Sequence, residues 1–431
     1  MAGCGSHDTA SRRPGKREPL SQEPGNAAQS TGAPEKRRWV TRGITGVALA
    51  SFFSDTGHEI TTSVLPSFIT VTLGGTAAAL GVIDGVSDAL TGLATLIVGP
   101  LANDPDRRLK MASGGYLVTA AATGAIGLAA TIWQAGLLRA TAWLARGVRS
   151  PARDATLASL APQDAYGRAF GMERAGDNLG AVAGPLLAAG FVTWFGIRPA
   201  LYLAAIPGIF SALAITVAAR EARRRRTVRT PQQRLRQQFD RVKASGLLSR
   251  LLPIAAFELG NMATTLLILR ATDLLRADGY TVAEATSLAV IVYAGHNLVA
   301  AIVAFLGGHW VDRHGPRAPF ALAAVLYIAA YTLFAITGQS WATLIPAFML
   351  AGAGIGLAET AESTLVASVL PDDLRGSGFG LLGGVQALGA FASSAIVGVL
   401  WAAISPTVGF LYAAAWMVTS ALGSGALTAA A

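Results

Sequence analysis

Three ionisable residues lie within five positions near the start of the chain, between two long apolar runs. They are Asp55, His58 and Glu59, in the stretch VALASFFSDTGHEITTSVLPSFI. Residues four apart share one face of a helix, so Asp55 and Glu59 lie together with His58 beside them. Carboxyl and imidazole groups that are removed from water between helices can bind and release protons near neutral pH. The stretch therefore indicates proton chemistry in an apolar environment.

The elements around these residues are predicted to be membrane-spanning helices. The chain has 431 residues, of which 52% are apolar and only 14% charged, whereas a soluble protein carries about 25% charged residues. Its mean hydropathy is +0.48. Apolar runs of about 20 residues recur, each long enough to cross ~30 Å of hydrocarbon as a helix. We predict an all-α polytopic membrane protein with twelve transmembrane helices, at roughly 43–71, 76–102, 112–131, 134–160, 167–193, 197–219, 248–275, 282–307, 317–337, 341–368, 376–402 and 406–429.

The net charge of +9 is concentrated in one segment. Residues 220–250 hold eleven Lys or Arg and two acidic residues, so this segment alone accounts for the total (11 − 2 = 9). Alternate loops contain no Lys or Arg, namely those near 72–75, 132–133, 338–340 and 403–405. This positive-inside pattern places both termini in the cytoplasm of a bacterial-type plasma (inner) membrane. We expect no nucleic-acid partner, because no recognition fold accompanies the charge.

The composition also divides the chain into segments. Residues 1–38 are rich in Gly, Pro, Ser, Gln and charge and lack the early apolar run of a signal peptide, which predicts a disordered cytoplasmic tail. The single cysteine, Cys4, lies in this tail, so disulfides are not expected. Two six-helix halves follow, at 40–219 and 248–431. They are joined by a basic cytoplasmic linker, 220–247, which is either a solvated connector or a contact for anionic lipid headgroups.

The two halves repeat with a constant offset of 209 residues (308 − 99 = 209). The identical pairs are Gly99 and Gly308, Arg108 and Arg317, Pro162 and Pro371, Phe170 and Phe379, Gly171 and Gly380, and Gly180 and Gly389. Parallel six-helix repeats related by an axis along the membrane normal are typical of one transporter architecture, in which the substrate site lies between the halves.

Two loops and two helices carry recognisable motifs. The loops are Gly99-Pro-Leu-Ala-Asn103-Asp-Pro-Asp-Arg107-Arg108 and Gly308-His-Trp-Val-Asp312-Arg313-His-Gly315-Pro-Arg317. They resemble the two copies of the G-x-x-x-D-R-x-G-x-R loop of the major facilitator superfamily. Arg139, twelve residues before Pro151, resembles the fourth-helix arginine motif of that family. Gly180-Ala-Val-Ala-Gly184-Pro185 resembles the helix-5 motif of its proton-coupled drug antiporters.

This resemblance covers residues 40–430 and implies a function. It implies a monomeric secondary active transporter that works by alternating access, without a cofactor. Proton-coupled export of a small organic compound or drug is the implied activity, so the partners are the lipid bilayer, a small-molecule substrate and protons. The runner-up is a proton-coupled transporter of a divalent metal ion or a small metabolite.

The first loop departs from the family pattern. Asn103 stands in place of the family's aspartate, and Asp104 in place of its arginine. In the family this loop latches the halves together, with its carboxylate facing positive charge or a helix N-terminus across the interface. Asn103 carries no charge, so we expect the second loop, with Asp312, to be the stronger latch. The predicted latch residues are Asp312, Arg313, Arg317, Asn103 and Arg108.

Ionisable residues inside the membrane are candidates for proton coupling, because each costs ~2.5–3.5 kcal/mol on insertion scales. The candidates are Asp55, Glu59, Arg139, Asp84 and Asp88. Glu59 and Arg139 are predicted at similar depth, so we expect Glu59 to be the partner of Arg139, with Asp84 as the alternative. A moving Arg139 would then switch a carboxylate between protonated and ionised states. The alternative is that these residues form static ion pairs that fix helix packing.

Other residues are candidates for the substrate cavity and for helix packing. His58, Phe52, Glu258 and Tyr293 lie in helices expected to line a central cavity, although a lipid-facing or core position explains the aromatic residues equally well. Gly180, Gly184 and Pro185 either seal the site or simply permit close helix approach.

Competing function classes find little support in the motifs. His58-Glu59 opens an H-E-x-x-H zinc motif, but Thr62 stands where the second histidine is required. No G-x-S-x-G elbow occurs, so an enzyme is not expected. Asp55, His58, Asp84 and Asp88 offer oxygen and imidazole donors for a transported metal ion, but no spacing rule supports a resident metal site.

Overall fold

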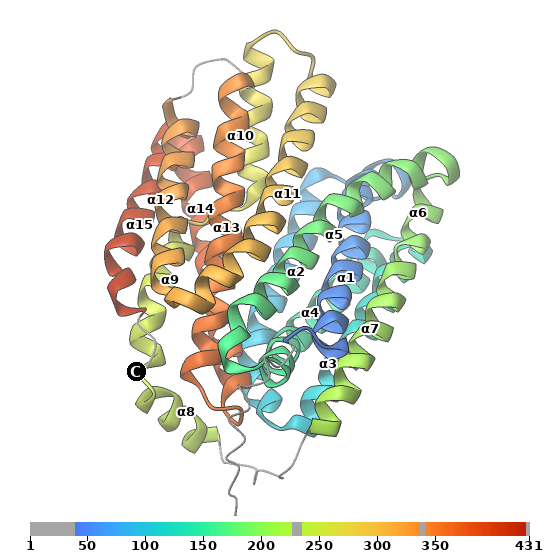
Figure 1. Ribbon diagram of the computed structural model, residues 1–431. Coiled ribbons are helices and arrows are strands. Elements are labelled where there is room, and N and C mark those ends of the chain that lie inside the picture. The colour runs from blue at the N-terminus through green and yellow to red at the C-terminus, as the bar shows by residue number, and fades with distance from the viewer. Residues whose placement is uncertain (1–38, 226–234, 337–340, 428–431) are drawn as a thin grey trace, which may run out of the picture. The chain divides into compact units, whose positions relative to one another are not determined.

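The computed structural model describes residues 39–225, 235–336 and 341–427. The predicted tail, with Cys4, and the centre of the predicted linker, 226–234, lie outside the described residues. Within the described ranges the regular secondary structure is helical throughout, as Figure 1 shows.

The N-terminal half contains seven α-helices that form six spans. They are α1 (Arg42–Ser67), α2 (Ala77–Val98), α3 (Pro105–Ala125), α4 (Ile132–Leu160), α5 (Tyr166–Phe195), α6 (Ile197–Leu203) and α7 (Ala205–Arg225). The short helix α6 and α7 together form the sixth span. A π-helical turn, η1 (Phe68–Thr72), extends α1, and a 3-10 turn, η2 (Gly99–Asn103), leads from α2 into α3.

The C-terminal half repeats this arrangement. After α8 (Leu235–Ala244), its helices are α9 (Leu247–Gly260), α10 (Thr264–Ala277), α11 (Val282–His314), α12 (Arg317–Ile336), α13 (Trp341–Val369), α14 (Arg375–Ala403) and α15 (Pro406–Gly423). A break at residues 261–263 separates α9 from α10, and the two together form one span.

The predicted fold class is confirmed. In the described chain, ten helical stretches are long and apolar enough to cross a membrane. The other two spans are α1 and α4, which have 26 and 29 residues and carry several charged side chains. Polar N-caps start several helices, including a capping box at the start of α4 formed by Thr131 and Gln134.

The 209-residue offset found in the sequence also relates the helices. Adding 209 to the bounds of α4 gives 341 and 369, which are the bounds of α13 (132 + 209 = 341; 160 + 209 = 369). The same shift carries α5 onto residues 375–404, and α14 covers Arg375–Ala403. Equivalent residues of the two halves can therefore be compared position by position.

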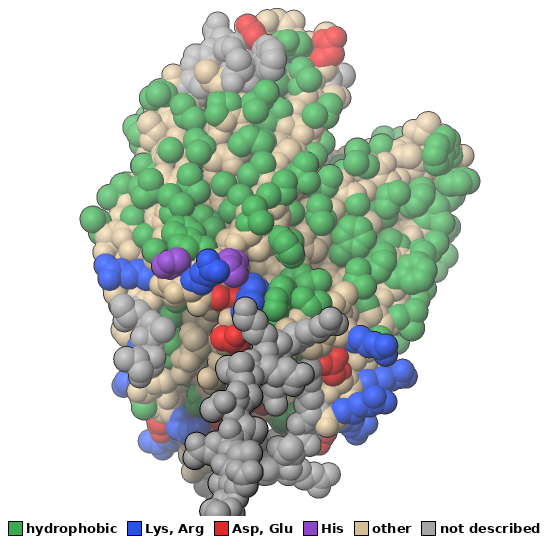
Figure 2. All heavy atoms as spheres, viewed as in Figure 1, with side chains coloured by type: hydrophobic (Ala, Val, Ile, Leu, Met, Phe, Trp, Pro, Cys, Tyr) green, Lys and Arg blue, Asp and Glu red, His purple; other side chains and the backbone are tan. Residues whose placement is uncertain are grey.

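The halves meet along two helix pairs, α5 with α11 and α2 with α14. Hydrogen bonds between the halves gather where α3 and α14 begin and α11 ends. We call this region the basic end, because Arg107, Arg108, Lys110, Arg313 and Arg317 lie in or beside it. Figure 2 shows apolar side chains over most of the visible face, with Lys, Arg and His gathered toward the lower part of the view.

Candidate functional site

Helix α4 presents an arginine face to the interior of the N-terminal half. Arg146, Arg149 and Arg153 follow one another at spacings of three and four, which places them on one side of the helix. Arg149 and Arg153 are buried, and the Arg146 side chain is one quarter exposed. Such a row of cations inside a membrane helix requires counter-charges from neighbouring helices.

Arg153 lies at the centre of a buried ionic network. Its Nε is 2.8 Å from Asp154 Oδ1, and its Nη1 is 2.9 Å from Glu173 Oε1 on α5. Asp177, one turn further along α5, lies 4.0 Å from the same Nη1. Ser51 of α1 donates to Glu173 Oε1 at 2.6 Å, so α1, α4 and α5 are tied together at this point. Contacts of this kind between several helices rigidify the N-terminal half.

Arg174 extends this network to the other half. Its Nε is 3.3 Å from Glu173 Oε2 and 3.8 Å from Glu359 Oε2 on α13. Its Nη2 also donates to Ser363 Oγ at 3.3 Å. A charged contact between α5 and α13 therefore joins the two halves.

A cavity of about 340 Å³ lies between the halves. The N-terminal half contributes Arg146, Arg153, Arg174, Asp154 and Asp177 to its lining, and the C-terminal half contributes Glu258, Asn261, Glu359 and Gln386. Asn261 directly follows the last residue of α9. The break between α9 and α10 therefore contributes to the lining of the cavity. Ligand pockets have volumes of roughly 300–1,000 Å³, so the cavity suits a small molecule.

The structure gives Asp55 and Glu59 different partners. Asp55 Oδ1 accepts from Arg146 Nη2 at 2.9 Å and so belongs to the cavity-facing network. Glu59 Oε1 is 3.5 Å from Nε2 of His58, and the His58 ring packs on Trp143 with centroids 4.4 Å apart. The two acids share a helix, as expected, but they belong to separate polar clusters.

Arg139 pairs with Asp84, which was the alternative to Glu59. Arg139 Nε is 3.3 Å from Asp84 Oδ1, and its Nη2 donates to Thr62 Oγ1 at 3.2 Å. Its guanidinium also stacks on Trp143, 3.4 Å from the ring centroid. Trp143 Nε1 in turn donates to Asp88 at 2.9 Å. These residues form a second cluster with His58 and Glu59, outside the lining of the cavity.

The helix-5 glycines bring α1 close to α5. A Cβ added at Gly180 would lie 2.9 Å from Asp55 Cβ, and one at Gly184 would lie 2.9 Å from the carbonyl oxygen of Thr56 and still closer to Glu59 Cβ. Such distances exclude any side chain. The motif therefore fixes the position of the acidic face of α1, and its packing role is directly visible.

Both predicted latch loops make hydrogen bonds between the halves, and the greater strength of the second stays a prediction. Asp312 accepts from the backbone N–H of Gly167 at 2.5 Å and from Arg168 Nε at 2.6 Å, at the start of α5. Asn103 makes the equivalent contact at the start of α14, where its Oδ1 accepts from Ser377 N–H at 3.0 Å. The counterparts agree with the offset, because 103 + 209 = 312 and 168 + 209 = 377.

The amide of Asn103 makes contacts that an aspartate does not make. Its Nδ2 donates to Ser377 Oγ at 2.7 Å and to Gln238 Oε1 of α8 at 3.0 Å. Arg108, which is 2% exposed, donates to Asp372 Oδ1 at 3.1 Å. Arg313 is exposed, and Arg317 is the first residue of α12. Neither residue takes part in the hydrogen bonds described between the halves. The expectation that the second loop is the stronger latch therefore misses the contacts of the first.

The residues predicted to line the cavity lie in different parts of the structure. Glu258 lines the cavity, whereas His58 lies in the second cluster. Phe52 packs edge-on against Phe53 with centroids 5.2 Å apart. Tyr293 stacks on His296 at 5.6 Å. Neither aromatic residue is part of the described lining of the cavity.

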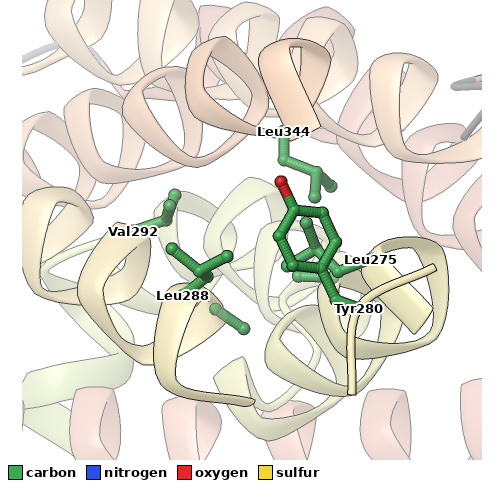
Figure 3. A pocket seen from close by; sticks show the side chains of 7 residues that line it. Leu275, Tyr280, Leu288, Val292 and Leu344 are labelled. Carbon is green, nitrogen blue, oxygen red and sulfur yellow. The ribbon is translucent and has the colours of Figure 1, made fainter. Parts of the chain in front are cut away.

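A second, apolar pocket of about 180 Å³ lies within the C-terminal half. Figure 3 shows Leu275, Tyr280, Leu288, Val292 and Leu344 around it. The Tyr280 hydroxyl is the only polar side-chain group among its lining residues. It offers no charge to a polar ligand, so the cavity between the halves remains the candidate site.

Reasoning from the sequence missed the residues that dominate this site, Arg146, Arg149, Arg153, Asp154 and Arg174. The sequence does contain a pattern that points to them. Three arginines at helical spacing within a predicted span are as costly as the carboxylates that were noticed. Their charges lie inside the predicted span 134–160, of which only Arg139 was singled out.

Comparisons with known proteins agree with the fold. The family model described as Major Facilitator Superfamily matches residues 47–271 and 251–429. An uncharacterised MFS-type transporter of Methanocaldococcus jannaschii is 24% identical over 390 residues, which cover 90% of this chain and 95% of that protein. An uncharacterised protein of Mycobacterium tuberculosis is 28% identical over 366 residues, 83% of this chain and 85% of its own.

Solved structures show the same fold at low identity. A bacterial homologue of the iron transporter ferroportin, in an outward-facing state, has a TM-score of 0.71 and 17% identity, covering 89% of this chain and 98% of its own. The Escherichia coli fucose:proton symporter has a TM-score of 0.68 and 14% identity, covering 91% and 100%. The human organic anion transporter MFSD10 has a TM-score of 0.67 and 16% identity, covering 90% and 99%.

Proposed function

This chain belongs to the major facilitator superfamily and is therefore a membrane transporter, and we propose that it exports a small polar organic compound in exchange for protons. The observation that carries the proposal is the cavity between the halves. Its N-terminal wall holds both arginines and aspartates, and its C-terminal wall holds Glu258 and Glu359 without an arginine. Alternating access at such an interface exposes the cavity to one side of the membrane at a time.

The charges of the cavity favour a polar cargo. Buried groups of both signs that are left unpaired by a bound apolar compound cost free energy, so a site of this kind discriminates against lipophilic molecules. A zwitterion or another compound with separated polar groups satisfies both walls at once. The resemblance of the Gly180–Pro185 segment to the antiporter motif supports export by proton antiport.

A metal cargo is less compatible with the contacts. Asp55 and Asp84 each lie beside an arginine, at 2.9 and 3.3 Å, and a cation next to a carboxylate opposes metal binding. Among the described residues no group of three or more His, Cys, Asp or Glu has the arrangement of a metal site. We therefore place the metal alternative second.

The orientation follows from the charge distribution. We propose that the basic end faces the cytoplasm of a bacterial-type inner membrane, with both termini on that side, and that the transporter works as a monomer. The bias is not absolute, because Arg198 lies at the opposite end, where it donates to the carbonyl oxygens of Gly127 and Ala129 at 2.8 and 2.9 Å. In this orientation the latch closes the cytoplasmic side.

Proteoliposomes that contain a pH-sensitive dye test the proposal. With an imposed pH gradient, zwitterionic, anionic and cationic organic compounds and divalent metal ions are added in turn. We expect proton movement with a polar organic compound. The response should be lost in Ser150→Trp, which fills the cavity, and kept in Leu137→Trp, which places the same side chain on the exposed face of the same helix. Proton movement with metal ions alone would contradict the proposal.

A further inference from the structure

The carboxylates of the two halves differ in their counter-charges. In the N-terminal network, Asp55, Asp154 and Glu173 each lie within 2.9 Å of an arginine nitrogen. In the C-terminal half, Glu258 and Glu362 are 4% and 1% exposed. Within the described residues neither forms an ion pair with Lys or Arg.

Amides take the place of arginines around these two glutamates. Glu258 Oε2 accepts from Asn261 Nδ2 at 3.0 Å, and Glu362 Oε2 accepts from Gln386 Nε2 at 2.8 Å. The second oxygen of Glu362, Oε1, is buried without any hydrogen-bond partner. An amide satisfies a carboxyl oxygen but supplies no positive charge, so an ionised carboxylate here would be uncompensated.

The repeat shows that this difference arose at equivalent positions. Subtracting 209 from 362 gives 153, so Glu362 stands where the N-terminal half has Arg153. By the same shift Gln386 stands at the position of Asp177, and Ile355 at that of Arg146. Gly180 packs against Asp55, and its counterpart Gly389 packs against Glu258. Asp55 and Glu258 are thus equivalent in their packing and not by the offset, because 258 − 209 = 49. The C-terminal half has an acid in α9 at this packing position, has a second acid in α13, and lacks both arginines.

The surroundings supply no hidden cation. The ionisable groups around the two glutamates are Glu359, Arg174, Tyr327 and Tyr331. Tyr293 and His296 of α11 stack on each other. Arg174 is engaged by Glu173 and Glu359, and His296 Nδ1 is 3.0 Å from the carbonyl oxygen of Phe348. Helix α14 begins with Arg375, which bonds Tyr166 at the basic end, and α15 contains no charged residue.

We propose that Glu258 and Glu362 form the proton-carrying site of the transporter and are both protonated in the conformation described here. The inference rests on the proposed proton coupling. Glu258 and Gln386 line the cavity, so water there reaches the pair. A proton that binds forms one O–H bond on a carboxylate and removes one negative charge; its release on the other side breaks that bond and restores the charge. Asp55, Asp154 and Glu173 of the N-terminal half each have an arginine as counter-charge, and we assign the carried proton to none of them.

Infrared spectroscopy of the full-length protein in lipid nanodiscs tests this assignment without any substrate. The C=O stretch of a protonated carboxylic acid is distinct from the bands of a carboxylate. At neutral pH we expect the wild-type spectrum minus that of Glu258→Gln with Glu362→Gln to contain this band. Asp55→Asn, at the equivalent N-terminal position, is the matched control, and it should leave the band unchanged.

Two outcomes would overturn the proposal: a difference spectrum without the band, or loss of the band in Asp55→Asn. Glutamine has the size of a protonated glutamate, so we expect the variants to fold. Each single variant should remove part of the band, and the single variants provide the test if the double variant does not fold. The result is separable from the transport assay. A band without substrate-driven proton movement refutes the proposed antiport and keeps the site, whereas proton movement without the band refutes the site alone.

Discussion

The two halves share a backbone frame but use their buried acids differently. In the N-terminal half, Arg153 holds Asp154 and Glu173 in a closed ionic network, whereas in the C-terminal half Gln386 contacts Glu362 through a neutral amide. A paired carboxylate keeps its charge because protonation would leave the arginine uncompensated. An amide-bonded carboxyl tolerates the neutral form. One half therefore pairs its buried acids with arginines and the other with amides, and this difference is the basis of the proposed proton site.

Removing the central arginine is expected to give the largest effect. Arg153→Met leaves Asp154 and Glu173 buried with Arg174 as their remaining counter-charge, at 3.9 and 3.3 Å. Breaking a buried pair costs ~3–5 kcal/mol, and we expect a loss of stability approaching this value. Thermal unfolding in detergent measures the loss. Arg236→Met, at an exposed position on α8, is the control and should match the wild type. An unchanged melting temperature for Arg153→Met would show that the network is not a structural unit.

The shared frame itself is tested by symmetric glycine substitutions. Gly180→Leu and Gly389→Leu each force a side chain against the helix that carries Asp55 or Glu258, and overpacking of this kind costs ~1–3 kcal/mol or more. Gly190→Leu and Gly398→Leu are the controls, since they have at most an ordinary van der Waals neighbour. Similar losses of thermal stability in both halves support the equivalence, and a loss in only one half would break it.

Neutralising equivalent acids should separate the halves. Asp55→Asn keeps an oxygen that can accept from Arg146 but removes the negative charge opposite it, and should cost ~1–3 kcal/mol, because a hydrogen bond between charged groups is replaced by a weaker one. Glu258→Gln replaces a protonated acid by its neutral isostere, so we expect no loss of thermal stability. Equal destabilisation by the two substitutions would mean that Glu258 is ionised and paired in some other way.

The two latch loops should behave more alike than their sequences suggest. Asn103→Asp loses the amide donor to Ser377 and Gln238, and Asp312→Asn loses the charge opposite Arg168; each change is expected to cost ~0.5–1.5 kcal/mol of latch closure. Distances between spin labels at Lys110 and Arg313, with Cys4 replaced, report opening of the basic end. An effect of Asp312→Asn alone would restore the second loop as the stronger latch.

The smallest expected effect concerns the second cluster. Arg139 and Asp84 form an ion pair in which Asp84 is 42% exposed, so their coupling energy should be only ~0.2–1 kcal/mol. A double-mutant cycle of Arg139→Ala with Asp84→Asn, read by thermal unfolding, measures it. The parallel cycle with Glu59→Gln should be additive. Coupling to Glu59 and not to Asp84 would reinstate the pairing expected from sequence.

Several features follow from the sequence because they depend on local pattern alone. Runs of apolar residues set the spans, with α4 at Ile132–Leu160 against a predicted 134–160. Loop spacing identified both latch segments, and the 209-residue repeat already implied two equivalent halves. These predictions succeed because the lipid bilayer offers no hydrogen bonds. A spanning helix must therefore pair its own backbone N–H and C=O groups and expose apolar side chains.

The tertiary structure alone decided which charges meet. The depths of Glu59 and Arg139 were compatible with a pair, yet Arg139 pairs with Asp84. Asp55 pairs with Arg146, which was not among the predicted site residues. Depth is set by position along one helix, which the sequence fixes to within a turn. Pairing also requires the rotation and separation of two helices, and these depend on close contacts such as Gly180 against Asp55. Since a charge pair weakens within a few ångströms, only the packed structure distinguishes an arginine-held acid from one that is free to take a proton.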